Sequence, residues 1–179
     1  QIVDQKTASY VDSAVEGGDV ILILDKTPFY GEMGGQVGDT GSIISESGEF
    51  RVDNSVAYSG GGIAVSGRVK KGTIAKGDVV DASVDVERRK DIARNHTATH
   101  ILQAALRNVL GSHVAQRGSL VTPERMRFDF THLSSISREE LKQVQSLVNS
   151  VIRQNLPVST GICSYSQAIS EGATAIFEE

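Results

Sequence analysis

The stretch from Val86 to Leu110 constrains the fold most, because its pattern predicts one long helix. Asp85 precedes it as a candidate N-cap, and Gly111 follows as a candidate residue just beyond the helix end. His96 and His100 are four residues apart, so both imidazoles lie on one face of this helix. That face is shared by Ile92, Thr99, Gln103 and Arg107. The opposite face carries an apolar stripe of Ala98, Ile101, Leu102, Ala105 and Val109.

The histidine pair has a chemical use at this spacing. Two imidazoles one turn apart can each give one nitrogen to a single metal ion, typically zinc. Zinc needs at least three protein ligands, so two ordinary helix histidines remain the alternative. Thr97 follows His96, so the pair is not the His-Glu-x-x-His motif of zinc proteases.

Composition excludes several classes of protein. The chain has 179 residues, of which 39% are hydrophobic and 22% charged, as in a soluble globular protein of one large or two small domains. No apolar run approaches the ~20 residues of a membrane span, and the first residues lack the pattern of a secretory signal. The single cysteine cannot form an internal disulfide, which fits a cytoplasmic location.

The net charge of −4 argues mildly against a nucleic-acid-binding protein. Two local basic clusters soften this objection. The first contains Arg88, Arg89, Lys90 and Arg94, and the second contains Arg125 and Arg127.

The amino-terminal half predicts a small antiparallel β-barrel over residues 19–85. Residues 1–18 are weakly patterned, which favours a linker or a short helix. Short strands with glycine-containing turns between them are typical of a barrel. The expected strands are residues 20–24, 41–44, 50–57, 63–69 and 79–84.

A glycine-rich loop spans Gly31 to Gly41 inside this barrel. It is not a phosphate-binding loop, because no Gly-Lys-Ser/Thr follows it, and its glycines lack the dinucleotide-binding spacing. The plain interpretation is that the glycines permit turns at positive φ.

Residues 86–179 predict an α/β sandwich, with helices packed on an antiparallel sheet, so the fold class of the whole chain is α+β. Strands are expected at residues 112–120, 126–130 and 158–164, and a short helix at 166–172. Ser137 and Glu140 form a capping box at the start of another helix, with Ile136 and Leu141 as a hydrophobic staple. Its buried stripe is expected to be Leu141, Val144, Leu147, Val148, Val151 and Ile152.

Several segments together resemble one known family. The segments His96–Arg107, Gly111–Leu120 and Arg127–His132 are similar to the editing domain of alanyl-tRNA synthetases. Residues Thr27–Gly41 resemble the glycine motif of the β-barrel that precedes that domain. The resemblance covers nearly the whole chain in the family's order. Free-standing proteins that edit mischarged tRNA share both parts.

The resemblance implies roles for individual residues. His96 and His100 match the first two zinc ligands, and Gln116 matches a polar residue that takes part in editing. Thr99 adds a hydroxyl near the metal. For Gln116 and Thr99 the alternative is an ordinary polar residue of a strand or a helix. In the family the glycine motif lies against the editing site and helps to shape it.

The chain also departs from the family's pattern. The family completes its zinc site with a Cys-x-x-x-His motif, which this chain lacks: Gln167 follows the only cysteine, Cys163, by four residues. Cys163 is therefore expected to be a half-buried structural thiol, and the chain to carry half a zinc site. His113 and His132 are expected to be hydrogen-bonded structural histidines. Asp129 and Arg127 are expected either to line the pocket or to pair with neighbours.

The leading interpretation is an internal fragment of such a synthetase, with an incomplete editing domain at residues 86–179. It would hydrolyse Ser-tRNA(Ala) and Gly-tRNA(Ala), while ATP and Mg would act only in a missing aminoacylation domain. The expected partners are tRNA(Ala) and the other domains of the parent protein, with no membrane. The alternatives are a free-standing deacylase that edits tRNA and a non-catalytic tRNA-binding module.

Overall fold

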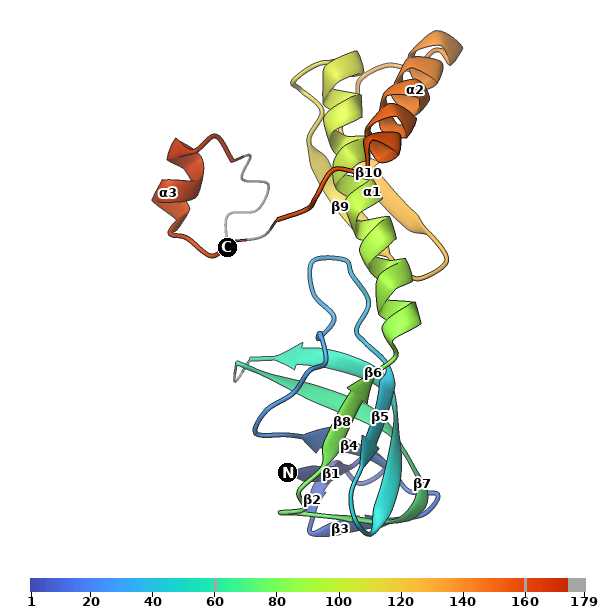
Figure 1. The fold of residues 1–179 in the computed structure, drawn as a ribbon, viewed down its shortest axis with the longest axis vertical. Helices are drawn as coiled ribbons and strands as arrows, with labels where there is room; N and C mark the ends of the chain where they lie inside the picture. Colours follow the sequence, from blue (N-terminus) through green and yellow to red (C-terminus); the bar gives the residue numbers. More distant parts are fainter. Residues whose placement is uncertain (60, 160, 174–179) are drawn as a thin grey trace. The chain divides into compact units, whose positions relative to one another are not determined.

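The computed structural model of the chain describes residues 1–59, 61–159 and 161–173 (Figure 1). It divides into two compact units, which we describe separately. The first unit contains residues 1–96 and 119–127, and the second contains residues 97–118 and 128–179. Helix α1 (Val86–Leu110) contributes to both units, since the division falls between His96 and Thr97. The helix has the bounds that the sequence predicts.

An antiparallel sheet of eight strands forms most of the first unit. Its strands are β1 (Ile2–Asp4), β2 (Ser9–Val11), β3 (Ser13–Val15), β4 (Asp19–Ile23), β5 (Gly41–Ile44), β6 (Gly48–Tyr58), β7 (Gly62–Ala75) and β8 (Asp81–Val84). The pairing order is β2-β1-β4-β7-β6-β5-β8, and β3 pairs with β7. The α+β prediction is confirmed. Among the described residues no pairing joins β2 to β8, so the ladder is not the closed barrel that the sequence predicts.

Residues 1–18 belong to this sheet, whereas the sequence favours a linker or a short helix. Ile2 pairs with Leu22, and Ala14 pairs with Ile74. Strands β1, β2 and β3 have only three residues each, which is too short to show a period-two pattern. Strand β1 is placed by pairing with β4, β2 by pairing with β1, and β3 by pairing with β7.

One apolar core is formed by residues of this sheet and of the loop after β4. Phe50, Ile43 and Val52 are essentially inaccessible to solvent, and Phe29 joins them from the segment between β4 and the glycine-rich loop. Alternate residues of β4, β6 and β7 point into this core, as expected for a sheet with one buried face. The loop after β4 is therefore anchored by its own phenylalanine.

The second unit contains the carboxyl-terminal part of α1 and helices α2 (Arg138–Gln154) and α3 (Tyr165–Ser170). It also contains the first half of strand β9 (Gln116–Val121), residues 116–118, and the second half of strand β10 (Met126–Phe130), residues 128–130; the other residues of these two strands belong to the first unit. The core of the second unit joins Ala105, Leu106, Val114 and Val144, with Phe128 and Phe130 packed against them. Strand β9 begins later than the predicted residue 112, because Ser112 and His113 form a turn after Gly111, which has a positive φ of 116°.

Helix α2 has the predicted capping box, but its buried stripe is narrower than predicted. Val144 is buried, and Leu147 and Val148 pack against the core, whereas Leu141 and Ile152 are about half exposed. The predicted strand at 158–164 is not formed by the described residues of that stretch. Helix α3 lies at the predicted position to within two residues.

The capping box of α2 predicts a pH-dependent contribution to stability. The backbone N–H of Ser137 and then its hydroxyl donate to Glu140, and these bonds lower the pKa of that carboxyl. Because the folded pKa lies below the unfolded one, the stabilisation is complete above the unfolded pKa and is lost as pH falls through the folded pKa.

We expect Glu140→Ala to lower the melting temperature at neutral pH, with the difference vanishing in acid. Glu139→Ala, in the same turn, is the control. A difference that persists at low pH would contradict this account.

Candidate functional site

The glycine-rich loop makes a tight hairpin at its tip. Gly34 and Gly35 have φ values of 60° and 82°, the left-handed conformation that a two-residue type I′ turn requires. The turn is closed by two backbone bonds, from Met33 N to Gln36 O at 3.2 Å and from Gln36 N to Met33 O at 3.0 Å. The glycines therefore permit positive φ, as the plain interpretation states, and they also fix where Gln36 lies.

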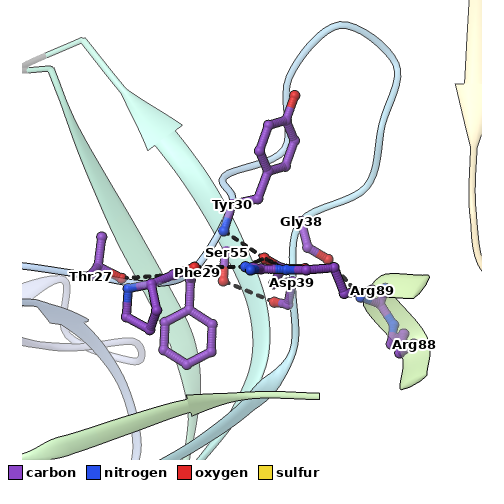
Figure 2. A network of polar contacts seen from close by, with 9 residues as sticks. Thr27, Phe29, Tyr30, Gly38, Asp39, Ser55, Arg88 and Arg89 are labelled. Carbon is purple, nitrogen blue, oxygen red and sulfur yellow. Dashed lines mark hydrogen bonds and ion pairs between the residues drawn. The ribbon is translucent and has the colours of Figure 1, made fainter. Parts of the chain in front are cut away.

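A buried carboxylate holds the base of the loop (Figure 2). Asp39 is buried and accepts from the backbone N–H of Tyr30 at 2.6 Å and from the Arg89 guanidinium. Arg88 donates to Gly38 O at 2.8 Å, and the buried hydroxyl of Ser55 donates to Asp39 O at 2.8 Å. These contacts fasten the loop to the first turns of α1 and to β6.

The tip of the loop is held by the end of β9. Val121 N donates to Gly35 O at 2.8 Å, Val37 N donates to Val121 O at 3.1 Å, and the Ser119 hydroxyl donates to Gly34 O at 3.2 Å. Gly35 lies so close that an added Cβ would overlap the carbonyl oxygen of Ser119. This contact explains why a side chain is excluded at Gly35, independently of its φ.

One side chain of the loop contacts a predicted metal ligand. The Nδ1 atom of His96 lies 2.6 Å from the Oε1 atom of Gln36. The neighbouring Asn95 donates from its side-chain amide to Thr122 O at 2.8 Å and to Pro123 O at 3.1 Å. The glycine-rich loop and the histidine motif, 60 residues apart in sequence, are thus in direct contact.

The two histidines of α1 are residues of a type that binds zinc. His96 and His100 both lie on α1 at the predicted i,i+4 spacing, and imidazole nitrogens are common zinc donors. Engagement of His96 Nδ1 by an oxygen is the outer contact that metal-binding histidines usually make. Among the residues that the structure describes, no group of three or more His, Cys, Asp or Glu could hold a metal, so these two imidazoles would need further ligands.

The face of α1 that carries the histidines is itself largely buried. Ile92, Thr99 and Gln103 are all buried, whereas His96 is half-buried and His100 is exposed. Helix α1 is therefore buried on more than its apolar stripe, which the helical wheel did not predict. Burial of the Thr99 hydroxyl and the Gln103 amide requires hydrogen-bonding partners.

The remaining predicted site residues lie on β9 and β10. Gln116 is the first residue of β9 and is half-buried. Arg127 and Asp129 are both exposed and alternate with the phenylalanines of β10, as predicted. A Cβ on Gly118 would lie 2.9 Å from Asp129 Oδ2, so the carboxylate covers that glycine.

His113 and His132 are hydrogen-bonded to each other, which confirms the prediction for these residues. His113 Nε2 lies 3.0 Å from His132 Nδ1, and the rings stack with centroids 5.2 Å apart. His132 Nε2 is also 3.2 Å from the Ser134 hydroxyl. Cys163 is exposed, so the prediction of a half-buried thiol is wrong. It lies between α2 and α3, where the described residues 156–159 and 161–164 are all exposed.

The residues of the first basic cluster make hydrogen bonds and ion pairs with other residues of this chain. Arg88 and Arg89 contact the glycine-rich loop, as described above. Lys90 pairs with Glu87 at 2.8 Å, and Arg94 pairs with Asp91. The sequence interpretation missed that Arg89 has a buried acidic partner. The sequence did contain a signal for this pair: an aspartate lies inside the glycine-rich loop, and two arginines lie at the start of the predicted helix.

A cavity of about 390 Å³ opens beside the loop. It is lined by Pro28, Phe29, Tyr30, Gln36, Arg89 and Ala93. A larger cavity of about 580 Å³ lies at the end of the sheet formed by β4, β7 and β8, and its lining contains no histidine or cysteine. Within the described residues, no helix is long and apolar enough to cross a membrane.

Comparison with known proteins identifies the family of this chain. Residues 2–88 match the family model of class II (A) tRNA synthetases. The chain is 52% identical over 169 residues to the alanine–tRNA ligase of Dehalococcoides mccartyi, and 49% identical over 174 residues to that of Chelativorans. The ligase of Wolbachia pipientis is 50% identical over 169 residues. These alignments cover 94–97% of this chain and 19–20% of each ligase. The chain therefore belongs to the alanine–tRNA ligase family and spans about a fifth of the length of those relatives.

Proposed function

We propose that this chain is the proofreading module of an alanine–tRNA ligase, which hydrolyses the ester of Ser-tRNA(Ala) and Gly-tRNA(Ala). The observation that carries the proposal is the contact between Gln36 and His96. It joins the two motifs, the glycine-rich loop and the histidine helix, that the family resemblance associates with editing.

The physical need for such a module follows from the size of alanine. A pocket that accepts alanine cannot exclude the smaller glycine, and it rejects serine poorly, because serine adds only a hydroxyl. Differences of this size give limited discrimination by binding alone, so a second site that removes the wrong amino acid restores accuracy.

The chain's own residues would hold and orient the reacting groups. His96 and His100 would supply two imidazole ligands, and zinc bound there would provide Lewis-acid polarisation or a positioned water. Gln116 would contribute a polar side chain to the pocket, and the Thr99 hydroxyl would lie near the metal. The remaining ligands would come from a Cys-x-x-x-His motif outside these 179 residues.

The wider setting follows from the relatives. We propose that the parent protein charges tRNA(Ala) with alanine in the cytoplasm, using ATP and Mg in a separate aminoacylation domain. The three relatives named above are alanine–tRNA ligases, which favours a module of the ligase over a free-standing deacylase.

Substrate selectivity tests this proposal. A ligase-length protein that contains this segment is expected to release serine and glycine from tRNA(Ala) in single-turnover assays, while Ala-tRNA(Ala) is largely spared. The 179-residue chain alone is expected to be nearly inactive, because it supplies only two of the metal ligands. Equal rates for the alanyl and seryl esters would contradict the proposed selectivity.

A further inference from the structure

We infer that Gln36 sets the tautomer of His96 and acts as a positioning residue, placing the imidazole proton on Nδ1 and the electron pair on Nε2. The first step of the argument is chemical. The atom of Gln36 that faces His96 Nδ1 at 2.6 Å is the amide oxygen, which can only accept a hydrogen bond. Nδ1 must therefore donate, and a neutral imidazole with its proton on Nδ1 carries its lone pair on Nε2.

The second step is that Gln36 is held in place by its surroundings. Its backbone closes the turn with Met33, and the residues on both sides of it bond to Val121. The base of the loop is fixed by the buried Asp39 and by Arg89. A glutamine on a flexible loop would pay the entropy of ordering when it bonds to a histidine. In this protein the fold already orders the backbone of Gln36, so little further backbone entropy is lost when the bond to His96 forms.

The third step is that Gln36 and His96 are anchored to the same short segment. Val121 holds the loop, while Thr122 and Pro123 accept from Asn95, the residue next to His96. Residues 121–123 thus form a common support for both partners of the 2.6 Å contact. The imidazole is fixed in position by the helix and in orientation by the amide.

The consequence concerns the metal ligand role. In water, the neutral histidine side chain favours the tautomer with its proton on Nε2, which has no lone pair at that atom for a metal. The Gln36 contact reverses this preference, so that Nε2 carries the lone pair that can bind a metal. Outer contacts of this kind typically change metal affinity by about 10–100-fold. This consequence rests on the proposed function, whereas the tautomer itself does not.

The test is ¹⁵N NMR of the histidine side chains in the metal-free 179-residue protein. At about pH 8.5, well above the ordinary histidine pKa of about 6.5, the two ring nitrogens show directly which one carries the proton. The His96 signals are assigned by their loss in His96→Asn. The expected result is a proton on Nδ1 in the wild type and in Gln36→Glu, which keeps an acceptor oxygen, and its loss from Nδ1 in Gln36→Leu.

Two results would overturn the inference. One is a wild-type His96 with its proton on Nε2, which would mean that the Gln36 amide is rotated. The other is a Gln36→Leu variant that keeps the Nδ1 proton. The pair His113 and His132 serves as an internal control, since its signals should be the same in all variants. In a ligase-length protein, Gln36→Leu should also weaken zinc binding by about 10–100-fold, measured by competition with a chelator. A normal tautomer pattern with no deacylase activity would refute the proposed function and leave this inference standing.

Discussion

Replacement of Asp39 by alanine is expected to destabilise the chain by about 2–4 kcal/mol. The Asp39 side chain is only 2% exposed, and it accepts from the Tyr30 N–H and from the Arg89 guanidinium. Its removal leaves the partly buried Tyr30 N–H without its acceptor and removes the counter-charge of Arg89. We place the effect below that of a fully buried ion pair, because the Arg89 side chain is 43% exposed. Urea denaturation followed by circular dichroism measures the change.

The matched control is Asp53→Ala. Asp53 pairs with Arg51 through two hydrogen bonds, but both side chains are about half exposed. Exposed ion pairs contribute little, so this variant should unfold close to the wild type. A loss for Asp53→Ala as large as that for Asp39→Ala would show that burial is not the cause. An unchanged stability for Asp39→Ala would show that the network does not hold the loop.

Replacement of Gly35 by alanine is expected to disrupt the tip of the glycine-rich loop, whereas alanine at Gly34 should be tolerated. Both glycines have positive φ, so an alanine at either position costs about 1–2 kcal/mol of backbone strain. At Gly34 nothing lies within 4 Å of an added Cβ. At Gly35 the Cβ would overlap the backbone of Ser119, so the bonds between the loop and β9 must break or shift.

The two glycines are adjacent and both have a positive φ, so the comparison isolates the contact of the added Cβ. Gly35→Ala should cost at least about twice the stability of Gly34→Ala, and its Val121 amide should lose protection in hydrogen exchange. The Val121 amide is the direct reporter because it donates to Gly35 O in the wild type. Equal effects of the two substitutions would mean that only φ matters at this turn.

Local signals in the sequence predict much of this fold. Helix α1, strand β5 and strand β10 have the predicted bounds, because each has a clear pattern and turn or cap residues at its ends. The capping box of α2 is likewise a local contact between Ser137 and Glu140. Such elements depend on neighbours within a few residues, and a single sequence contains that information.

Other features depend on contacts between distant parts of the chain. The strands β1, β2 and β3 are too short to show a pattern, and they exist because β4 pairs with β1, β1 pairs with β2, and β7 pairs with β3. The burial of Thr99 and Gln103 was not predicted, since a helical wheel shows which residues share a face but not what covers it.

The candidate site was predicted in part. Its residue types and the helix that carries the histidines follow from the sequence. The buried pairing of Asp39 with Arg89 spans 50 residues, and the contact of Gln36 with His96 spans 60. Neither spacing has a periodicity that a sequence pattern could show. The roles of His96, His100, Gln116 and Thr99 in hydrolysis stay predictions.

The most direct test of the central claim, that this segment hydrolyses mischarged tRNA(Ala), is the single-turnover rate of Ser-tRNA(Ala) hydrolysis by a Gln116→Ala variant of a ligase-length protein. The rate of alanine charging and the melting temperature are measured on the same preparation. The account predicts that hydrolysis falls at least about tenfold, equivalent to about 1.4 kcal/mol of transition-state stabilisation, while charging and melting stay unchanged. Unchanged hydrolysis would contradict the role of Gln116. A loss accompanied by destabilisation of about 2–5 kcal/mol, as for a core truncation, would show that the residue is structural.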